Sequence, residues 1–217
     1  MFYVYEQIKR QPFFFYGLFI LLITSLALCL FTGKGWLFIA ANPSHSPVAD
    51  VFFVNYTFLG DGLFVLTVGL FFLLVNEVRV FIQITAGYLL SGLAVQVVKH
   101  TLAEPRPRNF FPEGTYANFK EGITNSGFDS FPSGHTASIF ALAVVLALYS
   151  AKKGVGLLCL LLAVIVAYSR VYLGHHFVHD VVAGAFTGVL SGLLVMALIR
   201  DVQFYQNKSL LQIKWGI

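Results

Sequence analysis

The stretch FFFYGLFILLITSLALCLF, Phe13–Phe31, is 19 residues long and carries no charge. A helix that crosses a bilayer needs about 20 predominantly apolar residues, so this stretch predicts a membrane-spanning helix. Lys9 and Arg10 precede it, as basic residues precede a secretory signal core. Because the run is longer than a usual signal core and no A-x-A site follows it, we expect the helix to be retained.

Further uncharged apolar runs follow along the chain, at Gly62–Val75, Val80–Val98, Thr136–Ala151, Gly154–Ser169 and Val181–Ile199. With the first run they predict an all-α fold, a bundle of six transmembrane helices. The second, fourth and fifth runs are short, so they must borrow flanking residues to cross the bilayer.

The segment Thr32–Asp61 separates the first two predicted helices. Its part Val51–Leu59 is aromatic and apolar, interrupted only by Asn55 and Thr57. Such a segment suits a helix that rests on the membrane surface, or a stretch that re-enters the membrane. Asp61 stands at the start of the next helix, where an acidic side chain more often caps the helix than acts as a catalytic acid.

The composition supports an integral membrane protein. Of 217 residues, 58% are hydrophobic and 11% charged, with a mean hydropathy of +0.79, whereas a soluble domain carries about 25% charged residues. This excludes a water-soluble globular domain and a disordered chain. The basic residues are scattered singly, so no nucleic-acid partner is expected. Six crossings leave no room for a second domain, so we expect residues 1–217 to form one membrane domain with a long loop at about 104–131.

The distribution of Lys and Arg predicts the orientation in the membrane. With the N-terminus in the cytoplasm, that side holds Lys9, Arg10, Arg79, Lys152, Lys153, Arg200, Lys208 and Lys214. The opposite side holds Lys34, Lys99, Arg106, Arg108, Lys120 and Arg170, and half of these belong to the candidate site described below. We therefore expect both termini in the cytoplasm and the long loop outside.

The last apolar run carries Gly184, Gly188 and Gly192 at four-residue spacing. A ridge of small residues lets another helix approach closely. That helix can belong to the same chain or to a second copy, so this face is also a candidate contact for a homo-oligomer.

Charged and imidazole side chains are expensive at membrane depth, so those at helix ends mark candidate sites. They form three clusters, namely Lys99 with Glu104 to Arg108, Pro132 to His135, and Ser169-Arg170 with His176 and Asp180. An alternating topology brings these clusters to one membrane face. Together they offer fixed cations, histidines, a carboxylate and a helix N-terminus, a set that suits a phosphate group.

His176 and Asp180 are four residues apart, so on a helix both would project from one face. The carboxylate would then hold one imidazole nitrogen and make the other a better nucleophile. A helix-capping pair that faces water is the alternative interpretation.

The tetrapeptide Pro132-Ser133-Gly134-His135 opens the fourth run. It offers a rigid turn, an N-cap serine and a glycine where backbone must approach something closely. Free N–H groups at such a helix start bind anions, although the tetrapeptide also suits an ordinary helix start. His135 could donate a proton to a leaving oxygen.

These residues resemble the three-part signature of the type 2 phosphatidic acid phosphatase family. Lys99 is followed after six residues by Arg106-Pro107, then comes the tetrapeptide at 132–135, and Ser169-Arg170 is followed by five residues to His176 and three more to Asp180. The order and inner spacings agree throughout. The resemblance therefore implies an integral membrane lipid phosphatase. With the orientation expected from the Lys and Arg distribution, its active site would lie at the extracytoplasmic end of the bundle.

The resemblance also implies a mechanism that needs no metal or other cofactor. His176 would attack phosphorus to form a phosphohistidine, oriented by Asp180, and His135 would protonate the leaving group and then activate water. The groups that would hold the nonbridging oxygens are Lys99, Arg106, Arg170, the Ser133 side chain and the Gly134 amide.

His175 and His179 are also four apart, which is metal-ligand spacing on a helix. A zinc site is the rival chemistry at this position. It would leave Lys99, Arg106 and Arg170 without a role, so we expect no metal and interpret the two histidines as hydrogen-bonding groups near the lipid headgroups.

A lipid phosphate suits a site at the end of a helix bundle, because the lipid tail can remain among the helices. The candidate substrates are undecaprenyl diphosphate, phosphatidylglycerophosphate, phosphatidic acid and a lipid A phosphate, and the expected location is the bacterial cytoplasmic (inner) membrane. A lipid phosphotransferase with the same intermediate is the enzymatic alternative. An anion transporter is disfavoured because the polar residues gather at one level and no pair of helices is broken at mid-depth. The loop aromatics Phe110, Phe111, Tyr116, Phe119 and Phe128 suggest a lid over the headgroup.

Overall fold

The computed structural model describes residues 2–42, 44–119, 121–150 and 152–199, and these form helices and connecting loops without a strand. The elements are α1 (Phe2–Arg10), α2 (Pro12–Phe31), α3 (Lys34–Ala41), α4 (Pro47–Tyr56), the 3₁₀ turn η1 (Thr57–Gly60), α5 (Gly62–Leu74), α6 (Val78–Leu102), α7 (Pro107–Phe110), α8 (Gly134–Tyr149), α9 (Lys153–Tyr172) and α10 (Val178–Leu198). Some residues used above to predict the orientation and the apolar runs lie outside the described residues, namely Lys120, Arg200, Lys208, Lys214 and Ala151.

Every predicted apolar run is helical, in α2, α5, α6, α8, α9 and α10. Four of the described helices, α2, α6, α9 and α10, are long and apolar enough to cross a membrane. The pair formed by α4–η1 and α5 is bent by 54° and would make a fifth span. Gly60 and Asp61 interrupt the chain direction at this bend, which fits either a broken span or the re-entrant stretch considered for the segment before Asp61.

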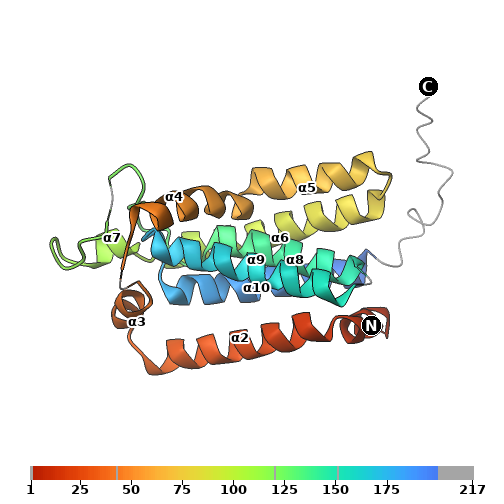
Figure 1. The fold of residues 1–217 in the computed structure, drawn as a ribbon, viewed down its shortest axis with the longest axis horizontal. Helices are drawn as coiled ribbons and strands as arrows, with labels where there is room; N and C mark the ends of the chain where they lie inside the picture. The colour runs from red at the N-terminus through yellow and green to blue at the C-terminus, as the bar shows by residue number, and fades with distance from the viewer. Residues whose placement is uncertain (1, 43, 120, 151, 200–217) are drawn as a thin grey trace.

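Helix α8 is short for a bilayer but occupies the centre of the bundle. Its 16 residues give a length of about 24 Å, against a hydrocarbon thickness of about 30 Å. It packs against α6, α9 and α10 (Figure 1), and most of its side chains are buried. Because other helices cover it, α8 can be short while the surrounding helices meet the lipid.

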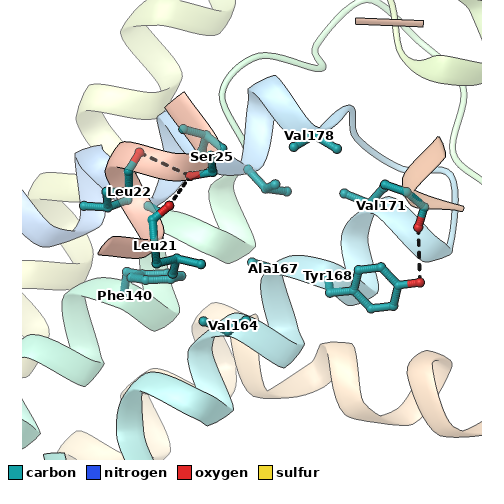
Figure 2. Close-up of a pocket in the computed structure, with 13 residues that line it drawn as sticks. Leu21, Leu22, Ser25, Phe140, Val164, Ala167, Tyr168, Val171 and Val178 are labelled. Atoms are coloured by element: carbon teal, nitrogen blue, oxygen red, sulfur yellow. Dashed lines mark hydrogen bonds between the residues drawn. The ribbon is translucent and has the colours of Figure 1, made fainter. Parts of the chain in front are cut away.

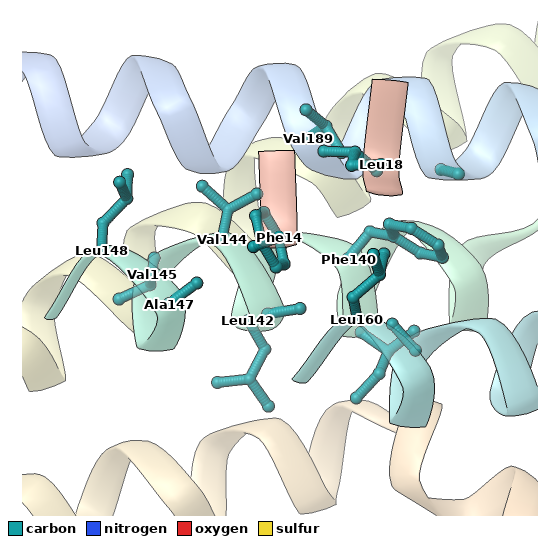
Figure 3. Close-up of a cluster of buried hydrophobic side chains, with 14 of the residues drawn as sticks. Phe14, Leu18, Phe140, Leu142, Val144, Val145, Ala147, Leu148, Leu160 and Val189 are labelled. Atoms are coloured by element: carbon teal, nitrogen blue, oxygen red, sulfur yellow. The ribbon is translucent and has the colours of Figure 1, made fainter. Parts of the chain in front are cut away.

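The core forms around this central helix. Phe14 of α2 lies beside Val144 of α8, and Leu18 of α2, Leu160 of α9 and Val189 of α10 belong to the same cluster (Figure 3). On the outside, α2 exposes large apolar side chains such as Phe31, which is 87% exposed. An apolar core combined with an apolar exterior is the pattern of a helix bundle in lipid.

The small-residue ridge of α10 packs against α8 of the same chain. A Cβ atom at Gly184 would lie 2.5 Å from the carbonyl oxygen of Ser133, and one at Gly188 would collide with the carbonyl oxygen of Ala137. A Cβ atom at Gly192 would lie 2.9 Å from Val144 Cβ. The Gly184/Gly188/Gly192 face is thus occupied by α8, so of the two alternatives considered above the structure shows a helix of the same chain.

Candidate active site

The turn between α9 and α10 carries His176. The sequence spacing predicted His176 and Asp180 on one helix, but α10 begins only at Val178, so that prediction is wrong for His176. Gly174 has a φ of +69°, which glycine adopts without strain. The turn folds back so that the His176 N–H donates to the carbonyl oxygen of Arg170 at 3.1 Å. The chain reversal buries the His176 side chain, which is 2% exposed.

Asp180 nevertheless lies against His176, with 3.4 Å between Oδ2 and His176 Nδ1. The same carboxylate oxygen accepts the Phe177 N–H at 2.8 Å and the hydroxyl of Ser130. Asp180 therefore caps α10 and faces the imidazole at once. The pair is buried and does not face water. Asp180 caps the helix, as one interpretation of the sequence held, and it lies beside the imidazole, as the other held.

The electrostatic surroundings keep the His176 imidazole neutral. Burial lowers its pKa well below the usual 6.5, and the charges of Arg170, Arg106 and Lys99 act in the same direction. With Nδ1 on the side of Asp180, Nε2 is the ring nitrogen left for chemistry. A neutral imidazole with one nitrogen oriented is the form that can act as a nucleophile.

Arg106 and Lys99 meet at one carboxylate, that of Asp129. Arg106 donates from Nε to Oδ1 at 2.7 Å and from Nη2 to Oδ2 at 3.0 Å, and Lys99 Nζ lies 3.7 Å from Oδ2. The Arg106 hydrogen bonds lower the pKa of Asp129 to about 2. Arg106 also donates from Nη1 to the carbonyl oxygen of His175 at 3.1 Å, which joins the first and third clusters.

Arg170 is held by a residue of the bent segment. Its side chain is 4% exposed, and Nη1 donates to Thr57 Oγ1 at 2.7 Å. Arg170 Nε is buried without a hydrogen-bond partner among the described residues. A guanidinium N–H left unpaired in a buried site is a ready donor for an anion.

The start of α8 joins the third cluster through its backbone. The Ser133 N–H donates to the carbonyl oxygen of Asp180 at 2.9 Å. The Ser133 hydroxyl oxygen caps α8 by accepting the Thr136 N–H at 3.4 Å, and it also accepts the Thr136 hydroxyl at 2.9 Å. A Cβ atom at Gly134 would meet only Val95, at 3.8 Å, so no contact within the described chain demands glycine there. His135 follows and is partly exposed, with its Nε2 3.9 Å from Asp61 Oδ2.

His175 and His179 are not placed to bind one metal ion together. His175 Nε2 donates to the carbonyl oxygen of Ile123 at 2.7 Å, and His179 Nε2 donates to that of Cys29 at 2.9 Å. Burial and Arg170 lower the pKa of His175 to about 3. Among the described residues, no group of three or more His, Cys, Asp or Glu side chains is placed to hold a metal ion. The two rings instead fasten the turn and α10 to the loop and to α2.

The aromatic side chains of the long loop pack inward. Phe111, Tyr116 and Phe119 surround Phe38 of α3, and Phe110 meets Phe177 at 5.2 Å between ring centroids. Phe128 is exposed. This cluster anchors the loop to α3 and to the turn that carries His176.

An apolar cavity of about 200 Å³ lies elsewhere, between α2, α8, α9 and α10 (Figure 2). Phe140, Val164 and Val181 are among its lining residues. None of the predicted site residues lines it.

The structure thus brings the three sequence clusters together at one end of the bundle, the end that carries α7 in Figure 1. The model of the PAP2 superfamily matches residues 80–204, which include all three clusters. The chain belongs to the PAP2 superfamily. This membership confirms the resemblance stated from the motifs.

Known PAP2 relatives are similar over parts of the chain. The bacitracin transport permease protein BcrC of Bacillus licheniformis is 40% identical over 44% of this chain and 46% of its own length. A lipid A 1-phosphatase of Rhizobium johnstonii is 32% identical over 48% and 41%. The undecaprenyl-diphosphatase BcrC of Bacillus subtilis is 28% identical over 77% of this chain and 79% of its own length. The chain thus spans less than half the length of the first two.

Solved PAP2 structures share the fold. Aquifex aeolicus LpxE superposes with a TM-score of 0.66 and 28% identity, over 74% of this chain and 93% of its own. A PAP2-type phosphatidylglycerolphosphate phosphatase from Bacillus subtilis gives a TM-score of 0.64 and 25% identity, over 86% and 96%.

Sequence reasoning missed four polar side chains of the site. Asp129 and Ser130 stand just before the tetrapeptide at 132–135, and this proximity was the available signal. Thr57 and Asp61 lie in a segment that composition marked only as interfacial and helix-capping. Asp61 is a cap, since its Oδ1 accepts the Leu63 N–H at 2.8 Å, but it also faces His135.

Proposed function

We propose that this PAP2 protein is a membrane lipid phosphatase that hydrolyses a phosphate monoester or a diphosphate of a lipid. One observation carries the proposal: the neutral, buried His176 lies beside Asp180, within reach of the charges of Lys99, Arg106 and Arg170. A nucleophile surrounded by cations suits attack on a phosphate, whose negative charge the cations offset. The names of the lipid A and undecaprenyl relatives support the same class of substrate.

In the first step, His176 Nε2 attacks phosphorus. The P–N bond forms while the bond from phosphorus to the lipid-side oxygen breaks, and His135 gives its proton to that oxygen. Asp180 stabilises the positive charge that develops on the His176 ring, as the carboxylate of a catalytic triad does for its histidine. The products of this step are a phosphohistidine and the lipid alcohol from a monoester, or the lipid monophosphate from a diphosphate.

In the second step, water attacks the phosphohistidine. His135, now neutral, takes a proton from the water as the new P–O bond forms and the P–N bond breaks. Orthophosphate leaves, and His176 returns to its neutral form. Neither step calls for a metal ion.

The oxyanion holders are proposed as Lys99, Arg106, Arg170, the Ser133 hydroxyl and the Gly134 N–H. Ser133 accepts its hydrogen bond from Thr136, so its own O–H can donate to a phosphate oxygen. The unpaired Nε of Arg170 and the open space beside Gly134 support this assignment. When phosphate binds, the Asp129 carboxylate must move away from Arg106 and Lys99, or both anions must contact these cations together.

The membrane arrangement is part of the proposal. We place six spans in the bilayer by counting α8 and the bent pair of α4–η1 and α5 with the four long helices. Both termini then lie in the cytoplasm and the site lies at the outer face of a bacterial inner membrane. Cysteines introduced at exposed loop residues, for example Asn109→Cys, would react with a membrane-impermeant maleimide in intact cells under this arrangement.

The acceptor of the phosphoryl group is proposed as water. A lipid hydroxyl would make the protein a phosphotransferase through the same phosphohistidine, and the assay separates the two outcomes by where the phosphate goes.

The test is phosphate release by the purified protein from phosphatidic acid, phosphatidylglycerophosphate, undecaprenyl diphosphate and lipid A. His176→Ala should lose at least about 10³-fold in rate. His100→Ala, a change at an exposed histidine of α6, is the matched control and should keep the wild-type rate. Transfer of the phosphate to a second lipid would favour the phosphotransferase, and a wild-type rate in His176→Ala would overturn the proposal.

A further inference from the structure

The junction between η1 and α5 is built to lie against the start of α8. A Cβ atom at Gly60 would lie 2.9 Å from the His135 carbonyl oxygen, 3.0 Å from His135 Cβ and 2.7 Å from Val166 Cγ1. A Cβ atom at Gly62 would collide with the Tyr88 hydroxyl. Gly60 therefore stands where glycine permits the approach of backbone to backbone, whereas a side chain at Gly62 would require Tyr88 to move. This close packing fixes Asp61 beside His135.

The two carboxylate oxygens of Asp61 have different neighbours. Oδ1 accepts the Leu63 N–H at 2.8 Å and caps α5. Oδ2 lies 3.9 Å from His135 Nε2. The cap thus fixes the carboxylate in an orientation that leaves its second oxygen toward the imidazole.

The other groups that face His135 are basic. They are Arg170 from α9, Lys99 from α6, and His176 and His175 from the turn before α10. Such surroundings disfavour a protonated imidazole, yet a general acid must hold a proton before it can donate one. Asp61 supplies a negative charge 3.9 Å from His135 Nε2, and its charge also acts on Arg170.

We propose that Asp61 is a positioning residue for His135: its carboxylate holds Nε2–H and stabilises the imidazolium, so that Nδ1 exchanges the proton with the leaving oxygen. This inference rests on the proposed function. Asp61 itself exchanges no proton. When the bond to the lipid oxygen breaks, the proton moves from His135 to that oxygen, and it returns from water when the P–N bond breaks.

The arrangement mirrors that of the nucleophile. Asp180 caps α10 and faces Nδ1 of His176, while Asp61 caps α5 and faces Nε2 of His135. In each case a helix-capping carboxylate orients one histidine. Each of the two histidines thereby has its own carboxylate, and each carboxylate is fixed by a backbone N–H.

The test compares Asp61→Asn with Asp61→Glu in the purified full chain, with short-chain phosphatidic acid and farnesyl diphosphate as probes. Asparagine caps helices as well as aspartate does, so Asp61→Asn removes the charge and keeps the cap. We expect kcat to fall at least about 10-fold with KM within about threefold, because a general acid contributes in the transition state. The melting temperature should stay at the wild-type value.

The pH profile gives the readout that a purely structural role would not move. Without the carboxylate, the imidazolium is less stable, so the alkaline fall in kcat should begin about one pH unit lower in Asp61→Asn. Asp61→Glu keeps the charge and should restore the wild-type profile and at least part of kcat. In a His135→Ala background, Asp61→Asn should have no further effect.

The outcomes separate this inference from the proposed function. If His135→Ala is impaired while Asp61→Asn keeps the wild-type kcat and pH profile, Asp61 only caps α5 and the inference is overturned. If His135→Ala and His176→Ala both keep the wild-type rate, the proposed function itself fails.

Discussion

The carboxylate of Asp129 contacts the Arg106 guanidinium through both oxygens, at 2.7 and 3.0 Å, in the two-point manner in which a phosphate would bind. Lys99 lies 3.7 Å from the same carboxylate. Asp129 is 57% exposed, so it can move aside into solvent. An anion of the protein itself thus contacts two of the proposed phosphate-binding cations.

Asp129→Asn should strengthen inhibition by orthophosphate. Removal of one negative charge from a partly exposed site is worth about 1 kcal/mol, which corresponds to about a fivefold lower inhibition constant. The inhibition constant is measured from the slowing of phosphate release by added orthophosphate. Glu104→Gln is the control, because it removes a carboxylate that is paired with Lys34 instead. A higher inhibition constant would mean that Asp129 serves to hold Arg106 in place.

Ser130→Ala should lower both stability and kcat. The Ser130 hydroxyl is fully buried and donates to Asp180 Oδ2, and a buried hydrogen bond to a charged group is worth about 1.5–3 kcal/mol. Ser138→Ala is the matched control, because that hydroxyl only donates to the Gly134 carbonyl oxygen of its own helix. Thermal melting in detergent and initial rates would report both effects, and equal behaviour of the two variants would speak against a role for Ser130.

Gly188→Ala should destabilise the bundle by about 2 kcal/mol, the usual result of overpacking a close contact. Its Cβ atom would collide with the Ala137 carbonyl oxygen and push α10 away from α8. Gly92→Ala on α6 has no heavy atom within 4 Å of the added carbon, so it should be neutral or slightly stabilising. Gly188→Ala should therefore melt at a lower temperature than Gly92→Ala. The reverse order would contradict the packing of the glycine ridge on α8.

His175→Gln should flatten the dependence of stability on pH. The folded pKa of His175 is about 3, below its usual 6.5, so between these values the unfolded chain binds more protons and stability falls as pH falls. At pH 5 this amounts to about 2 kcal/mol. Glutamine can donate to Ile123 without titrating, so the melting temperature of the variant should drop less between pH 7.5 and pH 5. If the melting temperature of the variant drops as steeply as that of the wild type, the lowered pKa assigned to His175 is refuted.

Much of the fold follows from the distribution of charge along the chain. Each uncharged run became a helix, because a run of this kind satisfies its backbone internally and keeps its side chains out of water. The number of spans did not follow as simply. The bend at Gly60 and Asp61 depends on close packing against His135, and the central place of α8 depends on neighbours that are distant in sequence.

The candidate site was predictable in its motif residues, but neither in the four polar side chains that lie outside the motifs nor in all of its geometry. Lys99, Arg106, Ser133, His176 and Asp180 meet as the motif order implied. The turn that carries His176 was missed, since a spacing of four residues reads as helix until the positive φ of Gly174 is known. Thr57 and Asp61 reach the site only through the bent segment, which no local pattern reveals.

The most direct test of the account is to trap the phosphoenzyme. The wild-type protein, mixed briefly with phosphatidic acid labelled in its phosphate and quenched in alkali, should carry acid-labile label on the peptide that contains His176. The wild-type protein should carry this label, and His176→Ala should carry none. Label on another residue, or a fully active His176→Ala protein, would contradict it.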